Sequence, residues 1–319
     1  MKLSIAIPAY NAERFLERMV RSLLNQTLKD LEVLIANDGS KDGTLALAQK
    51  LAREDPRVRV FDIHPNAGAY GARLRAWKEA RGEYITAVDA DDWVEPNMYE
   101  RMIELADREK LDVVQCDVFG AAEADGRVET LTGEEVYQRV VYPTLVDCGE
   151  GAYVWNKIYR NVYDFSTWVT GGFGSYEDLI HNLQLFRSVK RMAFLHEGFY
   201  HYEVTPSSVT RNFNVRGLEV FKEVASVKRQ LVGAYGIAPN APVLDKWEAN
   251  DLRNAMITAS IAPAVDWKTK VGNVRAVMCM DKFPWKWMLA CPAIVAFFID
   301  KAWHLRAKLM GERVSCASR

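Results

Sequence analysis

The chain has 319 residues, of which 49% are hydrophobic and 26% are charged, and its formal net charge is −1. This composition excludes the disordered and fibrous classes, and the length suffices for one large domain or two smaller ones. A nearly neutral chain attracts no polyanion overall, so we expect no nucleic acid partner. Residues 266–319 nevertheless hold ten Lys and Arg against four Asp and Glu, a net charge of +6 that leaves −7 for residues 1–265.

The five cysteines are widely spaced and include no Cys-x-x-Cys pair. This pattern argues against a disulfide framework or a zinc site and favours a reducing compartment. The first residues lead directly into a predicted strand, so we expect no signal peptide. The longest uncharged apolar run, residues 287–299, is interrupted by Pro292 and is too short to cross a bilayer. The predicted location is therefore the cytoplasm.

Apolar strands and amphipathic helices alternate through the first 116 residues. Strands are predicted over residues 3–7, 31–36, 58–61, 84–88 and 112–116. Helices are predicted between them, with Pro8 ending the first strand and Thr44 as the N-cap of the second helix. This alternation predicts an α/β fold with a mostly parallel sheet and helices on both faces.

Four loops follow the carboxyl ends of the first four predicted strands. They are residues 8–11, 37–40, 64–68 and 89–92. Ligands of open parallel sheets lie at this edge, so we expect the four loops to converge on one crevice.

The rhythm is less regular after residue 116. Residues 117–150 predict a polar insertion with one short helix near residues 133–142, and residues 171–175 predict a flexible loop. Further strands are predicted over residues 153–159, 194–196 and 199–203, with a helix opening at residues 176–178. From residue 217 the pattern is helical to the end. The predicted domains are residues 1–212, with a nucleotide half (1–116) and an acceptor half (117–212), and a helical C-terminal region (213–319).

Three carboxylates, Asp89, Asp91 and Asp92, follow the fourth predicted strand directly. Carboxylates this close repel each other unless a cation lies between them. The stretch therefore predicts Mg²⁺ or Mn²⁺ bound together with phosphate oxygens. The alternative is a solvated acidic turn that caps the helix starting near Pro96.

The glycine-rich signatures of phosphate-binding loops are absent after the first strand. Residues 8–11 read Pro-Ala-Tyr-Asn, which matches neither a dinucleotide fingerprint nor a P-loop. A metal on Asp91 would then take over the bridging of two phosphates.

Residues 1 to about 210 resemble the inverting glycosyltransferases of family 2, which have the GT-A fold and include builders of bacterial surface polysaccharides. The matching stretches are residues 7–13, 22–27, 37–44, 82–85, 89–93, 155–157, 176–178 and 200–210. Each stretch is weak alone, and their shared order and spacing carry the resemblance. The resemblance implies a Rossmann-like GT-A sheet followed here by a helical C-terminal extension.

The resemblance also implies a nucleoside-diphosphate sugar donor, typically UDP-linked, and a divalent metal, Mn²⁺ or Mg²⁺. The nucleobase site would be lined by Pro8, Ala9 and Tyr10. Glu13 would support the ribose or its own loop, and Asp38 would hydrogen-bond the base edge. For Tyr10, the alternative is a core aromatic side chain.

The acidic stretch and the later part of the chain take the remaining implied roles. Asp89 and Ala90 would meet the ribose, and Asp91 would bind the metal of this Asp-x-Asp motif. Asp178 would be the catalytic base, because an acceptor hydroxyl needs a carboxylate to take its proton. A single base opposite the leaving group would invert the anomeric centre. The alternative for residues 177–178 is an acidic pair favoured by the dipole of its helix.

The chain departs from the family pattern in the helix after the third strand. Arg73 is kept, which preserves a contact with the diphosphate or with a structural carboxylate, whereas Leu74 and Ala76 replace an Asn and a Gly. His181 is interpreted as a core or surface residue, and His201 stays ambiguous.

The stretch 155–157 is assigned with less detail. Trp155 is interpreted as packing, and Asn156 and Lys157 are candidates for approaching the acceptor or a phosphate.

The C-terminal third lies outside the resemblance. Residues 283–289 are rich in Trp and aliphatic side chains, and basic residues follow at 301, 306 and 308. Trp beside Lys next to a short apolar run is typical of a segment lying in a membrane interface. We therefore expect residues 283–319 to contact the cytoplasmic face of the inner membrane, which suits a lipid-linked acceptor. The alternative is packing on the body or on a second copy in a homo-oligomer.

Together these features predict a metal-dependent glycosyltransferase that acts on a glycan or lipid-linked saccharide. Two rival hypotheses remain. A sugar nucleotidyltransferase would carry a basic, glycine-rich signature after the first strand, which residues 8–11 lack. A catalytically degenerate glycan- or partner-binding scaffold would have lost Asp91 or Asp178, and both are present.

Overall fold

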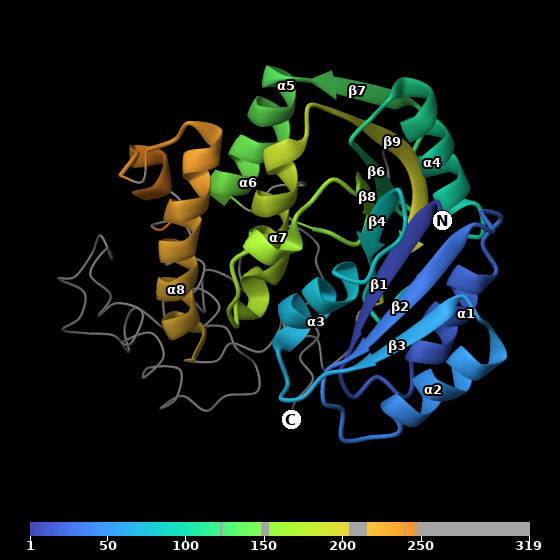
Figure 1. The fold of residues 1–319 in the computed structure, drawn as a ribbon. Helices are drawn as coiled ribbons and strands as arrows, with labels where there is room; N and C mark the ends of the chain where they lie inside the picture. The colour runs from blue at the N-terminus through green and yellow to red at the C-terminus, as the bar shows by residue number, and fades with distance from the viewer. Residues whose placement is uncertain (122–123, 148–152, 204–215, 239, 246–247, 249–319) are drawn as a thin grey trace, which may run out of the picture. The chain divides into compact units, whose positions relative to one another are not determined.

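The computed structural model describes residues 1–121, 124–147, 153–203, 216–238, 240–245 and 248 (Figure 1). The chain divides into two compact units. The first comprises Met1–Thr205 and Gln230–Ile237, and the second comprises Pro206–Arg229 and Ala238–Arg319. The domain boundary predicted at residues 212/213 stays a prediction. The helices predicted beyond residue 248 and the membrane segment 283–319 lie outside the described residues.

The strands of the described residues form one nine-stranded sheet in the first unit, in the order β3-β2-β1-β4-β8-β6-β9-β5 with β7 beside β9. Their bounds are β1 (Leu3–Ala9), β2 (Leu31–Asn37), β3 (Val58–Asp62), β4 (Tyr84–Ala87), β5 (Trp93–Val94), β6 (Val113–Val118), β7 (Val128–Thr132), β8 (Lys157–Arg160) and β9 (Arg191–His201). The pairs β3·β2, β2·β1, β1·β4 and β6·β9 are parallel, whereas β8 runs antiparallel to both β4 and β6. The parallel sheet predicted for the first four strands is confirmed.

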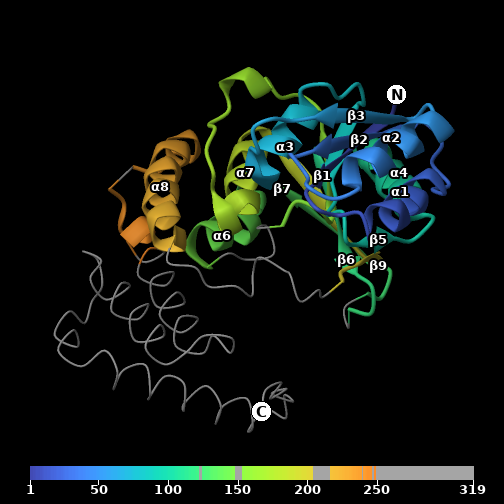
Figure 2. The same cartoon turned by 90° about the horizontal axis from the view of Figure 1, so that it is seen from below.

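Helices cover both faces of this sheet, as predicted. Figures 1 and 2 show α1 and α2 on one face, with α4 on the same side, and α3 and α7 on the other. The helix bounds are α1 (Leu16–Leu24), α2 (Thr44–Glu54), α3 (Gly68–Trp77), α4 (Met98–Glu109), α5 (Glu134–Val136), α6 (Tyr142–Asp147), α7 (Glu177–Leu185) and α8 (Arg216–Leu231). Among the described residues, no helix is both long enough and apolar enough to span a membrane.

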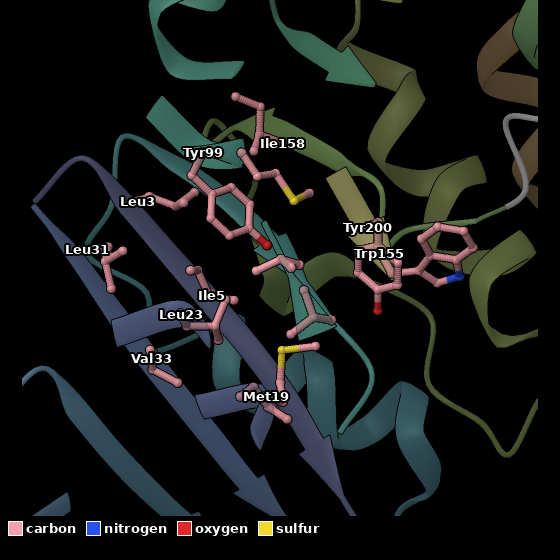
Figure 3. Packing of buried hydrophobic residues seen from close by; sticks show 14 of the residues in the cluster. Leu3, Ile5, Met19, Leu23, Leu31, Val33, Tyr99, Trp155, Ile158 and Tyr200 are labelled. Carbon is pink, nitrogen blue, oxygen red and sulfur yellow. The ribbon is translucent and has the colours of Figure 1, made fainter. Parts of the chain in front are cut away.

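The main core lies between the sheet and the layer of α1 and α4 (Figure 3). Alternate residues of β1 point to this face, so Leu3, Ile5 and Ile7 are fully buried there. Met19 and Leu23 meet them from α1 because residues four apart share one helix face. Each such side chain stabilises the fold by about 1.5–3 kcal/mol on burial. The packed layer holds the carboxyl ends of β1, β2 and β4 rigidly side by side.

Two predictions at the first loops were wrong in detail. Pro8 does not end the first strand, because β1 continues to Ala9. Proline lacks the N–H that a strand donates to its neighbour. The Ala6 carbonyl accepts from the Val88 amide, and backbone groups two residues apart point to the same side, so the nitrogen of Pro8 also faces the β4 side. Pairing with β4 ends at Ala6, so the missing N–H costs no hydrogen bond between the strands. The second helix takes Gly43 as its N-cap, and Thr44 is its first residue.

The later half differs more from the prediction. Residues 117–150 contain strand β7 in addition to helical segments, and one continuous strand, β9, replaces the two predicted over 194–203. The strand predicted over 153–159 is confined to β8. Edge and antiparallel strands such as β7 and β8 depend on distant partners, so local periodicity identifies them poorly.

Candidate active site

Hydrogen bonds join the first two loops at the carboxyl edge of the sheet. The Asn11 amide donates to Ser40 Oγ at 3.0 Å, and the Lys41 amide donates to Asn11 Oδ1 at 2.8 Å. Asn11 has a positive φ of 51°, a conformation that Asn tolerates better than most residues. Tyr10 is 53% exposed at the tip of this turn, so the core alternative for it is wrong. The neighbouring Pro8 is half-buried and Ala9 is fully buried.

Glu13 supports the loop that precedes α2. Its Oε2 accepts from the Gly43 amide at 3.0 Å, and its own amide donates to Asp42 Oδ2 at 3.3 Å. A Cβ at Gly43 would overlap the Glu13 carboxylate, which is the far end of a flexible side chain and would have to move aside. These contacts are with the second loop, whereas the sequence predicted support of the ribose or of Glu13's own loop, which stays a prediction.

Asp38 connects the second and third loops. It is only 2% exposed, and its Oδ1 accepts from the Ala67 amide at 2.7 Å. Its carbonyl accepts from Asn66 Nδ2, also at 2.7 Å. Burial raises the pKa of Asp38, and the hydrogen bond from Ala67 opposes that shift. One carboxylate oxygen is thus committed to positioning the residues that lead into α3.

Arg73 of α3 joins the acidic stretch after β4 to the start of α7. Its Nη2 donates to Asp89 Oδ1 at 2.8 Å, and its Nη1 ion-pairs with Asp178 Oδ1. Arg73 is 4% exposed, and the two carboxylates raise its pKa against the opposing effect of burial. Of the contacts predicted for Arg73, the one with a structural carboxylate is present. Within the described part of the chain, its Nε has no hydrogen-bond partner.

The three carboxylates of the acidic stretch have different surroundings. Asp92 is 1% exposed, and its two oxygens accept from the Tyr200 hydroxyl at 2.6 Å and from the Glu203 amide at 2.8 Å. It therefore anchors the end of β9. Burial, assisted by the charge of Asp89, raises the pKa of Asp92 to about 7. Burial and Asp89 also raise the pKa of Asp91, whose carbonyl accepts from Arg18 Nη2 at 2.6 Å. Ala90 between them is buried.

The start of α7 brings Glu177 and Asp178 to the same place. Asp178 is held at both oxygens: Arg73 contacts Oδ1, and the Val154 amide lies 3.4 Å from Oδ2. Its side chain is 22% exposed. Desolvation raises the pKa of Asp178, and the charge of Arg73 opposes this. Desolvation also raises the pKa of Glu177, to about 7. The acidic pair thus faces an arginine, and the helix dipole alone does not explain its arrangement.

Two candidates for the acceptor side are buried instead. Lys157 is fully buried and donates to the Tyr153 carbonyl and to Asn156 Oδ1. Asn156 is 6% exposed and donates to the Cys116 carbonyl. These polar groups fix the chain around β8, and the prediction that they approach an acceptor or a phosphate stays a prediction. Trp155, at 7% exposure, packs as predicted.

The two histidines left open by the sequence are both packed. His181 is fully buried and stacks on the ring of Tyr70 with ring centroids 4.1 Å apart, which confirms the core interpretation. His201 stacks on Trp93 and on Phe119, at 3.4 and 4.1 Å, and reaches Glu95.

Three residues of the site had no specific prediction. Arg18, Tyr200 and Glu203 hold the acidic stretch through the contacts described above, and Arg18 also pairs with Glu203 at 3.0 Å. Their partners lie 73 to 185 positions away in sequence, so no local pattern links them. For Tyr200 and Glu203 the only signal was the family match over residues 200–210, which assigned no role to its members, and Arg18 lies outside all the matching stretches.

The acidic stretch fits a divalent cation that phosphate oxygens help to bind. In the described part of the chain, no group of three or more His, Cys, Asp or Glu side chains is arranged to hold a metal alone. Mg²⁺ and Mn²⁺ need only one or two protein carboxylates when phosphates and water complete the coordination. The charge of Asp89 already raises the pKa of Asp91, and a cation would relieve this repulsion.

The sequence of the chain is similar to those of known glycosyltransferases and polysaccharide synthases. EpsJ, an uncharacterized glycosyltransferase of Bacillus subtilis, is 35% identical over 218 residues, which are 65% of this chain and 62% of EpsJ. The chondroitin synthase of Pasteurella multocida is 48% identical over 98 residues, 31% of this chain and 10% of that protein. The chain covers less than two thirds of the length of such curated relatives.

Solved structures share the fold. The crystal structure of residues 1–349 of S. aureus TarS in complex with UDP has a TM-score of 0.58 and 19% identity, covering 96% of this chain and 92% of that chain. At this identity the likeness shows the GT-A fold alone. The model described as "Glycosyl transferase family 2" matches residues 4–170, which is more than half of the chain. The chain therefore belongs to glycosyl transferase family 2.

Proposed function

We propose that the protein transfers a sugar from a UDP-linked donor to a hydroxyl group of a glycan or lipid-linked saccharide, with inversion of the anomeric centre. Two comparisons support the substrate classes. TarS has been crystallised with UDP and with UDP-GlcNAc, and the chondroitin synthase relative is named for a polysaccharide product. The predicted nucleotide half, residues 1–116, would hold the donor.

The observation that carries the proposal is the pair of contacts made by Arg73. One guanidinium contacts both Asp89 and Asp178, so it sets the distance between the acidic stretch and the start of α7. A transferase of this kind needs a carboxylate base held close to the donor's sugar, and such positioning contributes much of the rate. The buried guanidinium of Arg73, which lies between Asp89 and Asp178, provides that positioning.

Asp178 is the proposed general base. Desolvation raises the pKa of Asp178, which makes it a stronger proton acceptor, and the charge of Arg73 opposes this by favouring the ionised form that accepts the proton. Its Oδ1 is committed to Arg73, whereas Oδ2 has only a long contact to the Val154 amide, 3.4 Å. Oδ2 is therefore the atom that takes the proton as the acceptor oxygen forms its bond to the anomeric carbon and the UDP oxygen leaves.

The donor side uses the residues of the first, second and fourth loops. The exposed ring of Tyr10 covers the nucleobase, with Pro8 and Ala9 forming the backbone wall beneath it. Asp38 contacts the base edge through the oxygen not used by Ala67, and Glu13 keeps the second loop in place.

The acidic stretch completes the donor site. Asp89 and Ala90 would meet the ribose, and Asp91 would hold the metal. A divalent ion there would neutralise charge that develops on the leaving diphosphate.

Donor turnover tests the proposal. Purified protein with Mn²⁺ is incubated with a panel of UDP-sugars, with and without an oligosaccharide acceptor, and UDP release is measured. We expect release from at least one donor and a rise in Tm with UDP, because a ligand that binds only the folded state stabilises it. No release from any donor together with no stabilisation by UDP would refute the proposal and favour a binding scaffold.

We also propose that residues 283–319 attach the protein to the cytoplasmic face of the inner membrane, near a lipid-linked acceptor. The pattern of Trp285, Trp287 and nearby Lys residues supports this. Flotation of the full chain with anionic liposomes, compared with a variant carrying Trp285→Ala and Trp287→Ala, is the test. Equal flotation of both proteins, or none by the wild type, would contradict membrane contact and leave packing on the body or on a second copy.

A further inference from the structure

A row of aromatic side chains lies next to the candidate base. Trp155 is 7% exposed and contacts Tyr153 and Tyr202, with ring centroids 5.2 and 5.9 Å away. These two tyrosines are 50% and 44% exposed, although large aromatic rings are usually buried. The buried face of the row rests on Tyr200, whose ring stacks on Trp155 at 4.4 Å (Figure 3). The two exposed rings of Tyr153 and Tyr202 thus pack against the buried ring of Trp155, which in turn packs against Tyr200.

The row is connected to both halves of the proposed site. The residue after Tyr153 is Val154, whose amide faces Asp178 Oδ2. At the other end, the hydroxyl of Tyr200 donates to Asp92 of the acidic stretch. The carboxylate oxygen that takes the proton therefore lies beside the backbone segment that carries Tyr153 and Trp155.

The backbone under the row is fixed before any ligand arrives. The buried Nζ of Lys157 donates to the Tyr153 carbonyl. The amide of the same peptide group, that of Val154, faces Asp178, so this peptide group is held on both sides. The Glu203 amide, one residue after Tyr202, donates to Asp92 at 2.8 Å. A surface whose backbone is held in this way loses little entropy when it binds.

The chemistry of the row selects a class of ligand. The face of an aromatic ring carries partial negative charge, so it attracts the weakly positive C–H groups on the face of a sugar ring. A pyranose with equatorial substituents presents several such C–H groups on each face. Tyr also offers a hydroxyl for hydrogen bonds to the edge of the sugar, which suits a ligand that is apolar on its faces and polar at its rim.

We propose that Tyr153 and Tyr202, supported by Trp155, form the acceptor platform, on which a pyranose ring with equatorial substituents stacks beside Asp178. This inference rests on the proposed function for its location, since the base defines where the acceptor must lie. The ligand is a glycan ring, and it is recognised by contact between its C–H face and the faces of the tyrosine rings.

The same strand end supplies a matched control. Side chains alternate along β9, so His201 points away from Tyr200 and Tyr202 and stacks with Trp93 and Phe119 on the opposite face. Phe119 is 56% exposed, comparable to the two tyrosines. Phe119→Ala removes an equally exposed aromatic ring that, among the described residues, stacks on His201 and not on any ring of the row.

The test uses cellotetraose as the probe and the full chain with Mn²⁺ and UDP. Saturation-transfer NMR reports which sugar protons touch the protein, and a titration gives Kd. We expect transfer to the ring C–H protons in the wild type. Tyr153→Ala and Tyr202→Ala should each weaken binding roughly threefold to tenfold, as expected for loss of one aromatic contact. Tyr153→Phe, Tyr202→Phe and Phe119→Ala should bind within about twofold of the wild type.

The outcomes separate this inference from the proposed function. Thermal stabilisation by UDP is measured on the same samples and should be equal in all variants. No transfer to cellotetraose in the wild type, or equal Kd values in wild type and both alanine variants, would overturn the platform while UDP binding remained. Absence of UDP stabilisation with tyrosine-dependent cellotetraose binding would instead refute the proposed transfer and leave the platform as a glycan-binding surface.

Discussion

Arg73 ion-pairs with Asp178, which lies 105 residues further along the chain, while its second terminal nitrogen lies 2.8 Å from Asp89. A helix on one face of the sheet thereby connects the end of β4 with the start of α7. The two carboxylates would repel each other without this guanidinium. The position of the proposed base relative to the proposed donor site thus depends on one buried side chain.

Arg73→Met keeps the bulk of the side chain and removes its charge. Two partly buried carboxylates would then lose their partner, and we expect the free energy of unfolding to fall by roughly 3 kcal/mol. UDP release should fall roughly a hundredfold or more, because the base loses its position and its stabilised charge. The control is Arg75→Met on the same helix, where the side chain is 45% exposed and pairs with Glu79. Equal urea denaturation curves for both variants would contradict the role of Arg73.

Gly43→Ala tests the support of the second loop by Glu13. The new Cβ overlaps the Glu13 carboxylate, so one of the two must move. The Glu13 side chain moves more easily than the backbone, so we expect it to give up its hydrogen bond from the Gly43 amide, at a cost of about 0.5–1.5 kcal/mol in the free energy of unfolding. UDP binding should weaken because the loop loses this support. Gly172→Ala is the control, since a Cβ there has no atom within 4 Å. Unfolding and UDP affinity unchanged from wild type in Gly43→Ala would mean that the loop is not held in this way.

Tyr200→Phe removes the hydroxyl that donates to Asp92 at 2.6 Å. Asp92 is almost fully buried, so its oxygen would be left without this donor, at a cost of about 1–3 kcal/mol. Mn²⁺-dependent UDP binding should also weaken, because Asp92 adjoins Asp91. Tyr163→Phe removes a hydroxyl that donates to the Leu185 carbonyl at 3.1 Å, and it should leave UDP binding unchanged. If the two variants lost UDP affinity equally, the effect could not be assigned to the acidic stretch.

Glu177 predicts a pH dependence of stability. Burial raises its pKa from 4.5 to about 7, so the folded state binds this proton more tightly than the unfolded state does. Its contribution to stability is therefore complete below pH 4.5 and is lost as the pH rises through 7, by about 3 kcal/mol at most. Glu177→Gln removes the titration. The free energy of unfolding of the wild type, minus that of the variant, should therefore decrease as the pH rises from 4.5 to 8. A constant difference would disprove the raised pKa of Glu177.

Much of the first 116 residues could be predicted from sequence. The strands β1, β2 and β4 are buried on both faces and therefore read as nearly continuous apolar runs, which local patterns reveal. The loops at their carboxyl ends were expected to converge, and the hydrogen bonds from the Asn11 amide to Ser40 and from the Ala67 amide to Asp38 join three of them.

The remainder depends on contacts between distant residues. Neither Asn156 nor Lys157 carries a local sign that its polar group is used inside the fold, and both were candidates for approaching the acceptor or a phosphate. Strand β8 pairs with β4 and β6, which precede it by dozens of residues, so its bounds follow from those partners. Likewise, the pairing of Arg73 with Asp178 follows from the packing of α3 beside α7, which periodicity does not specify.

The most direct test of the account compares Asp178→Asn with Asp91→Asn by calorimetric titration with UDP and Mn²⁺ and by UDP release from the donor that turns over. Asp30→Asn is the control, because that side chain is 63% exposed and precedes β2 at the opposite edge of the sheet. We expect Asp178→Asn to bind UDP like the wild type and to lose roughly a hundredfold or more of the turnover. Asp91→Asn should lose the Mn²⁺-dependent part of UDP binding. Near wild-type turnover by Asp178→Asn would contradict the assignment of the base.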